Sequence, residues 1–429
     1  MTIYALSTGP GVSGIAIIRI SGSDSSKAIT LLTGKPIPLP RVACLRKINN
    51  INTSELIDQG IIIWFPGPES YTGEDMAEIH VHGGKAVVLT LQNELSKIEN
   101  FRLAEPGEFT KIAFQNGKIN LLKAESIADL ISAETEIQRQ QAIKIMSGAS
   151  SDKFNSWREG LLKILSNVEA KIDFSDEDLP KNITRDIIEQ KENIIKKIEE
   201  IIKLSNKNRS LMSGFVISVI GRPNTGKSSF VNYVSGRDVS IVTKIPGTTR
   251  DPIESEVDIG GYHLVFIDTA GIRRHKNKIE KIGIEKSFEK SKNSDLNLVF
   301  LEKNEIKEYE NIEKKIFVKS KYDIRKQGKS KNIYRISSKT GYGIATLLRV
   351  IQRKFALNNK NELPIISRER QLAKVKKCLK HLKSFNLEKN IDMAAADIRS
   401  ALKEINEIYH KFDIEEILDI IFNDFCIGK

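Results

Sequence analysis

The feature that most constrains the fold is the segment Gly221-Arg-Pro-Asn-Thr-Gly-Lys-Ser228, which has the spacing G-x-x-x-x-G-K-[ST]. An apolar run, Phe215–Ile220, precedes it, and a helical pattern follows it. In this context the pattern predicts a loop whose backbone N–H groups surround phosphate oxygens, with Lys227 near the β- and γ-phosphates and the Ser228 hydroxyl on Mg²⁺. The positive end of the following helix faces the same anion. The sequence therefore predicts a nucleotide site on an α/β sheet.

Two further segments fit such a site. Asp268-Thr-Ala-Gly271 follows an apolar run, at the position where parallel sheets place ligand-binding residues. We expect Asp268 to hold Mg²⁺ through water and the Gly271 amide to sense the γ-phosphate. Between the two motifs lies Gly247-Thr-Thr-Arg-Asp251. This loop has a threonine that can complete the Mg²⁺ shell, and such loops become ordered when the γ-phosphate is present.

The expected base is guanine. The strand at 316–318 is followed by Lys319-Ser-Lys-Tyr-Asp323. In the guanine-specific pattern Asn-Lys-x-Asp, the Asp carboxylate accepts two hydrogen bonds from the base and the Lys stem packs on it. Ser320 stands in the Asn position, so we expect weaker affinity more than altered base preference. An ATPase and a scaffold with a decayed nucleotide site remain alternatives.

Patterns elsewhere predict a multidomain chain. Strands are expected at 13–21, 60–65 and 78–81, followed by a helix to about residue 97, and helices at 121–131, 153–172 and 185–204. Strands then alternate with helices at 215–220, 264–267, 296–301, 316–318 and 333–336, which favours a doubly wound parallel sheet. Helices follow at 368–385, 394–409 and 414–425. Helices on both sides of the sheet suggest a helical domain with the nucleotide domain inserted in it.

Composition gives weaker indications. The net charge of +12 over 429 residues fits a nucleic-acid partner or, equally, a Lys-rich set of solvated helix faces. The three cysteines, Cys44, Cys378 and Cys426, lack metal-ligand spacing, so a reducing cytoplasm is the expected compartment. No segment has the length and apolarity of a membrane span or a secretory leader. His80 and His82 have no third ligand nearby in the sequence, so metal binding there is not expected.

Several segments resemble the MnmE (TrmE) family of tRNA-modifying GTPases. They are the phosphate loop with its Asn, the Gly-Thr-Thr-Arg-Asp loop, Tyr71-Thr-Gly-Glu-Asp75, Ala104-Glu-Pro-Gly-Glu-Phe-Thr110 and the terminal Cys426-Ile-Gly-Lys429. The resemblance covers the whole chain. It implies a tetrahydrofolate-binding and dimerising N-terminal domain (1–118), a discontinuous helical domain (119–213 and 357–429) and an inserted Ras-like GTPase domain (214–356).

The resemblance also implies chemistry and partners. With an MnmG-type flavoprotein, in a heterotetramer built on a homodimer, the family adds a carboxymethylaminomethyl-type group to the wobble uridine of certain tRNAs. It uses a one-carbon unit of a reduced folate such as 5-formyl-tetrahydrofolate. The implied folate residues are Arg19, Glu78, Lys118 and Lys429. A regulatory GTPase acting in ribosome assembly is the alternative, because it would share the nucleotide motifs.

Catalytic roles follow from the same resemblance. Ile272 occupies the position of the Ras-type water-orienting Gln, and an apolar side chain cannot polarise water, so Glu280 is the candidate. The family uses K⁺ between facing nucleotide domains, and Asn224, Thr243, Ile245 (through its carbonyl) and Thr248 fit its ligands. Cys426 is a nucleophile or redox group, or else a small apolar residue beside Phe425.

The complete set of expected nucleotide and cation contacts, with Ser228 and Thr249 as Mg²⁺ ligands, is Asn224, Thr225, Gly226, Lys227, Ser228, Ser229, Thr243, Lys244, Ile245, Pro246, Gly247, Thr248, Thr249, Asp268, Thr269, Ala270, Gly271, Ser320, Lys321, Asp323, Ser337, Ser338 and Lys339.

Overall fold

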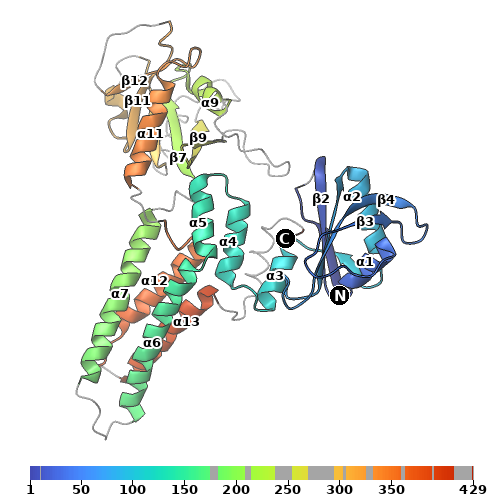
Figure 1. The fold of residues 1–429 in the computed structure, drawn as a ribbon. Coiled ribbons are helices and arrows are strands. Elements are labelled where there is room, and N and C mark those ends of the chain that lie inside the picture. Colours follow the sequence, from blue (N-terminus) through green and yellow to red (C-terminus); the bar gives the residue numbers. More distant parts are fainter. Residues whose placement is uncertain are drawn as a thin grey trace, which may run out of the picture. The chain divides into compact units, whose positions relative to one another are not determined.

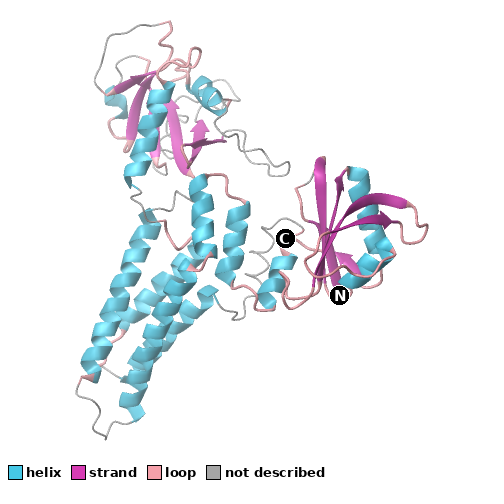
Figure 2. Cartoon of the chain, in the orientation of Figure 1, coloured by secondary structure: helices cyan, strands magenta, loops and turns pink. Residues whose placement is uncertain are grey.

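A computed structural model describes residues 1–9, 11–173, 182–207, 214–236, 254–268, 294–302, 306–324, 332–358, 363–388, 391–409 and 428. The chain divides into two compact units. Unit 1 comprises residues 1–128, 146–151 and 405–429, and unit 2 comprises residues 129–145 and 152–404. Figure 1 labels the elements, and Figure 2 shows the same view coloured by helix and strand.

Unit 1 is built on a six-stranded sheet of order β3-β4-β5-β2-β1-β6, in which only the β1–β6 pair is parallel. Alternation along β2 directs Ile18 and Ile20 into a core that also contains residues of α1 and α2. The opposite face packs on α3 through Ala5 and Phe109. The elements are β1 (Thr2–Leu6), β2 (Ser13–Ser21), α1 (Ser25–Thr33), β3 (Cys44–Asn49), β4 (Leu56–Phe65), β5 (Met76–Gly83), α2 (Lys85–Ser96), β6 (Phe101–Leu103) and α3 (Glu108–Gln115).

Helices make up much of unit 2. Phe154 and Trp157 of α6 pack edge to face in the buried stripe of that helix, 5.4 Å between ring centroids. Ion pairs join α13 to α6 and α12 to α7. In the described residues, no helix is long and apolar enough to cross a bilayer. The helices that lie wholly or mostly in unit 2 are α5 (Glu136–Met146), α6 (Ala149–Asp173), α7 (Ile183–Lys207), α12 (Glu369–Ser384) and α13 (Ile391–Tyr409), whereas α4 (Leu121–Ile131) lies mostly in unit 1.

A second six-stranded sheet, of order β12-β11-β10-β7-β9-β8, forms the rest of unit 2. All its pairs are parallel except the edge pair β8–β9. One core contains apolar side chains of the sheet, α9 and α11, and Phe215 stacks on Phe355 at 4.1 Å between centroids. The elements are β7 (Phe215–Gly221), α9 (Lys227–Ser235), β8 (Glu254–Ile259), β9 (Tyr262–Asp268), β10 (Leu296–Phe300), a 3₁₀ turn η1 (Ile306–Tyr309), β11 (Lys315–Lys319), β12 (Ile333–Arg335) and α11 (Ile344–Asn358).

The expected α/β and α+β fold class is confirmed, and each strand and helix predicted within the described residues is found. The predicted helix at 414–425 lies outside them. The sequence analysis did not predict β1, β3, β6 and β8. Three of these, β3, β6 and β8, are edge strands. Because an edge strand is covered less than a central one, charged side chains interrupt its apolar alternation.

Candidate functional site

The phosphate loop follows β7, at the point where the strand order of the sheet reverses. Such a switch point is where open α/β sheets bind ligands. Gly221 has φ 146°, and a Cβ on it would lie 2.3 Å from the carbonyl oxygen of Phe300. Gly226 has φ 88° and immediately precedes α9. Both glycines are therefore required by the close turn that leads from strand to helix.

Lys227 is the first residue of α9, and its side chain reaches back into this loop. Its side chain is 5% exposed, and its Nζ donates to the carbonyl oxygens of Gly221 at 2.7 Å and Arg222 at 2.8 Å. The Thr225 hydroxyl donates to the Arg222 carbonyl at 2.7 Å and closes the turn from the other side. The ammonium group is thus held where the loop backbone curls, and phosphate oxygens would compete with these carbonyls for it. Ser228 and Ser229 occupy the first turn of α9.

The loop after β11 is bonded to the phosphate loop. The Ser320 hydroxyl donates to the carbonyl oxygen of Thr225 at 2.5 Å, and Lys321 Nζ donates to that of Asn224 at 2.7 Å. Asn224 and Lys321 both adopt positive φ, 62° and 60°. Ser320 therefore connects the base loop to the phosphate loop with its single hydroxyl donor.

Asp323 is positioned by a second loop. The buried Ser337 hydroxyl donates to Asp323 Oδ1 at 2.7 Å and also accepts the Thr340 N–H at 3.2 Å. The strand-end segment that contains Ser337, Ser338 and Lys339 therefore lies beside Asp323. A pocket next to these loops is lined by Asn224, Thr225, Leu301, Glu302, Lys319, Ser320, Lys321, Tyr322 and Arg335.

The structure thus brings together the phosphate loop and the two base-recognition segments. The Asp268 backbone pairs with Val219, so the carboxyl end of β9 lies beside that of β7. The other predicted positions lie outside the described residues: Thr243, Lys244, Ile245, Pro246, Gly247, Thr248, Thr249, Thr269, Ala270, Gly271, Glu280, Cys426, Lys429 and the side chain of Asp268.

Unit 1 contains a second polar cluster. Arg19 and Glu78 are opposite each other on β2 and β5, and Arg19 Nη2 lies 2.9 Å from Glu78 Oε1. His80 Nε2 lies 3.3 Å from the other oxygen of Glu78. The Arg19 guanidinium lies 5.7 Å from the centre of the Tyr71 ring, a contact that the sequence analysis did not single out. Burial raises the pKa of Tyr71, although hydrogen bonding with Thr110 and the charge of Arg19 oppose the shift.

The loop around Tyr71 connects this cluster to Lys118. The stem of Lys118 lies close to Gly73, where an added Cβ would be 3.3 Å from its Cγ. Asn116 Nδ2 donates to the carbonyl oxygen of Thr72 at 2.8 Å. The structure therefore places Arg19, Glu78 and Lys118 around one loop, with the Arg19 charge already partly neutralised by Glu78.

The chain returns to this unit near its last residues. The Ser7 hydroxyl donates to the carbonyl oxygen of Gly428 at 2.8 Å, although the two residues are 421 apart in the sequence. Gly428 is buried with φ 98°, and a Cβ on it would lie 2.2 Å from the Leu6 carbonyl oxygen. Gly428 therefore lies against the end of β1, the strand next to the one that contains Arg19.

A mostly parallel sheet with a phosphate loop at its switch point, joined to a Lys-x-Asp base loop, defines the class of P-loop GTPases. The family is shown by sequence comparison. The model of the GTP-binding protein TrmE N-terminus matches residues 2–118, and that of the MnmE helical domain matches residues 121–426. The chain belongs to the MnmE family.

Full-length relatives agree with this assignment. A tRNA modification GTPase MnmE of Pelagibacter ubique is 54% identical over 444 residues, covering 100% of both chains. Proteins of the same name from Rickettsia bellii and Paramagnetospirillum magneticum are 40% and 37% identical, covering 100% of this chain and 100% and 99% of theirs. The solved G domain of the T. maritima FeoB iron transporter matches 34% of this chain and 98% of its own at 21% identity, with a TM-score of 0.25.

Proposed function

We propose that this protein is a GTP hydrolase that acts in tRNA modification. The observation that carries the proposal is the connection between Lys227 in the phosphate loop and Asp323 in the base loop, through the Ser320–Thr225 hydrogen bond. Phosphate and base recognition are thereby held in one arrangement, as GTP requires. The full-length relatives named tRNA modification GTPase support the biological role.

The test is GTP turnover by the purified protein with unlabelled ATP as competitor. Turnover that ATP does not inhibit supports guanine selection by Asp323. Competition by ATP would instead support the ATPase alternative. Nucleotide binding without turnover would support a scaffold whose site has lost its activity.

We further propose that hydrolysis requires K⁺. A cation held by the Asn224 side chain and the loop before Thr248 would neutralise charge that develops between the β- and γ-phosphates. The hydrogen bond from Lys321 Nζ to the Asn224 carbonyl oxygen supports the K⁺ proposal, because it holds the backbone that carries the Asn224 side chain. Turnover should be fast in KCl and slow in NaCl at matched ionic strength, whereas equal rates would refute the K⁺ requirement. Glu280 is proposed to orient the attacking water and Ser228 and Thr249 to ligate Mg²⁺.

For unit 1 we propose binding of a reduced folate by Arg19, Glu78 and Lys118, with Lys429 nearby. The arrangement of these side chains around the Tyr71–Asp75 loop supports it, as does the position of Gly428. Equilibrium dialysis with 5-formyl-tetrahydrofolate should detect binding to the unaltered chain and weaker binding to Arg19→Ala. Equal binding by both would refute the role of Arg19.

The proposed partners are tRNA, a second copy of this chain and an MnmG-type flavoprotein, with which the wobble uridine would receive a carboxymethylaminomethyl-type group. Exposed Leu45 and Ile61, directly opposite each other on β3 and β4, support self-association of unit 1. Expression of the chain in cells that lack their own homologue should restore the modified wobble uridine. Restored ribosome assembly with unmodified tRNA would support the regulatory-switch alternative instead.

A further inference from the structure

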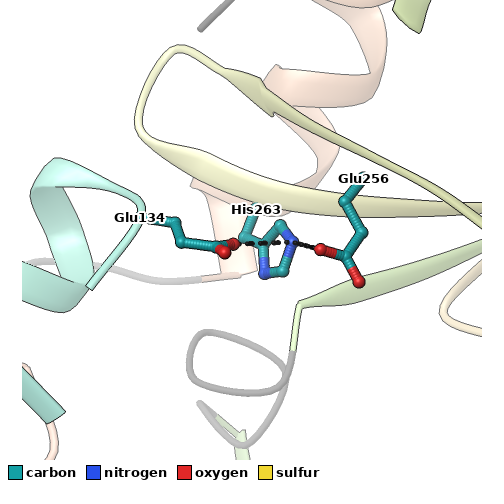
Figure 3. Close-up of side chains that lie close together, drawn as sticks. All are labelled: Glu134, Glu256 and His263. Atoms are coloured by element: carbon teal, nitrogen blue, oxygen red, sulfur yellow. Dashed lines mark ion pairs between the residues drawn. The ribbon is translucent and has the colours of Figure 1, made fainter. Parts of the chain in front are cut away.

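Unit 2 contains a cluster of three side chains away from the nucleotide loops. His263 lies on β9, Glu256 on β8, and Glu134 between α4 and α5. One ligand atom from each lies within 4.8 Å of the other two. Figure 3 shows the His263 ring between the two carboxylates.

The pairing of β8 with β9 explains how two of these residues meet. Glu256 is opposite Val265, and His263 is opposite Asp258, so Glu256 and His263 are diagonal neighbours. Residues two apart on a strand share a face of the sheet, and diagonal partners are within reach of long side chains. Asp258, on the same face, already accepts the Gly261 N–H at 2.8 Å.

The third side chain is held in place by its own loop. Thr135 and Gln138 form a capping box at the start of α5: Gln138 N donates to the Thr135 hydroxyl, and Gln138 Oε1 accepts the N–H groups of Glu134 and Thr135. Ile137 packs against the hydrophobic core of the second sheet. The backbone that carries Glu134 is therefore fixed near the β8–β9 hairpin.

The two distances from the His263 imidazole to the carboxylates are compatible with ligands of one cation. His263 Nε2 lies 3.4 Å from Glu134 Oε2 and 3.7 Å from Glu256 Oε2, beyond the usual range of N–H···O hydrogen bonds of about 2.7–3.2 Å. With metal–ligand bonds of about 2.0–2.1 Å, tetrahedral ligands are separated by about 3.3 Å. His263 Nε2 is buried and has no hydrogen-bond partner among the residues that the structure describes.

The charge in the cluster is also unbalanced. Two carboxylates face one imidazole, and the His263 side chain is 11% exposed. A divalent cation would remove the repulsion between the carboxylates and occupy the lone pair of the imidazole.

We infer that Glu134, Glu256 and His263 form a binding site for a divalent transition metal of the Zn²⁺ type, with one position left to water. Histidine nitrogen and carboxylate oxygen are a common ligand set for such ions. The metal would connect the loop before α5 to the β8–β9 hairpin, and β9 ends at Asp268. The site goes beyond the proposed function and does not depend on it.

The test uses the untagged, nucleotide-free full chain titrated with Co²⁺, whose visible absorption is strong at low coordination number and weak in the octahedral geometry of a Mg²⁺ site. We expect one equivalent to give the strong band and Zn²⁺ to displace it. The variants Glu134→Gln, Glu256→Gln and His263→Gln should lose the band. The matched control is His381→Gln, because His381 lies 3.9 Å from one carboxylate, that of Asp397, and should keep the band.

A second readout is the melting temperature. Zn²⁺ should raise the Tm of the unaltered chain and of His381→Gln, but not that of Glu134→Gln, a substitution of similar size and shape at a side chain that is 33% exposed. The absence of a strong Co²⁺ band in the unaltered chain would overturn the site. A band that persists in His263→Gln would also overturn it and leave the cluster as an ion pair.

Discussion

Replacing Ser320 by alanine removes the hydroxyl that connects the base loop to the phosphate loop. The lost bond runs to the Thr225 carbonyl at 2.5 Å and is partly buried. A hydrogen bond of this kind contributes about 0.5–1.5 kcal/mol net. If the nucleotide binds only the connected arrangement, GDP affinity should fall about twofold to twelvefold, since 1.4 kcal/mol corresponds to a tenfold change. Base preference should not change, because Asp323 and Ser337 remain bonded to each other.

The assay is titration with a fluorescent GDP analogue, followed by competition with GTP and ATP. Ser235→Ala is the matched control: it removes a hydroxyl whose one partner among the described residues is the Val231 carbonyl within α9, and it should leave the dissociation constant unchanged. Asp323→Ala should lose guanine preference. An unchanged affinity in Ser320→Ala would refute the reasoning, and so would a lost preference for guanine in that variant.

Three other substitutions or modifications have defined outcomes. Gly226→Ala forces a left-handed residue to carry a Cβ 2.5 Å from Ser320 Oγ, so about 1–2 kcal/mol of strain should weaken GDP binding roughly 5- to 30-fold in the same titration. Glu94 accepts bonds from Asn50, Ile51 and Lys97; burial opposes its ionisation, but the Lys97 ammonium and the Ile51 N–H outweigh it and lower the pKa of Glu94. A carboxylate whose pKa is lowered in the folded state stabilises the fold at pH values above its ordinary pKa of 4.5. Glu94→Gln should therefore reduce the free energy of unfolding near pH 7 by roughly 1.5–3 kcal/mol, measured as a lower Tm. The difference between the two chains should shrink as acid protonates Glu94 in the unaltered chain. Burial raises the pKa of Cys378 to about 12, so peptide mass spectrometry should find it unalkylated at mildly alkaline pH while the partly exposed Cys44 reacts; equal labelling of both would contradict the burial.

The sequence predicted what local patterns and motifs determine. Regular apolar spacing located β7 and the helix α7, and the phosphate-loop motif predicted a strand–loop–helix unit that the structure contains. Spacing alone could not predict that Ser320 bonds Thr225, since 95 residues separate them and the partner is a backbone carbonyl. From the sequence, Ser320 in place of Asn predicted weaker nucleotide affinity, yet its hydroxyl makes a hydrogen bond between the base loop and the phosphate loop.

The sequence did not predict which side chains from distant segments contact each other. Glu134, Glu256 and His263 lie in three separate segments, and none belongs to a motif with metal-ligand spacing. Arg19 and Lys118 were selected through the family resemblance, because an isolated cation in a sequence does not reveal its neighbours. The pairing register of β2 and β5 is what places Glu78 beside Arg19.

The bond between Ser7 and Gly428 has a consequence for synthesis. A ribosome that adds about 5–20 residues per second needs about 20–80 s to make the 421 residues between them. Elementary folding events take microseconds to milliseconds, so the first sheet is assembled long before its last partner exists. The β-strands of this sheet must therefore remain folded on the nascent chain without the contact to Gly428. Any ligand site that depends on Gly428 is therefore completed only after translation has passed that residue.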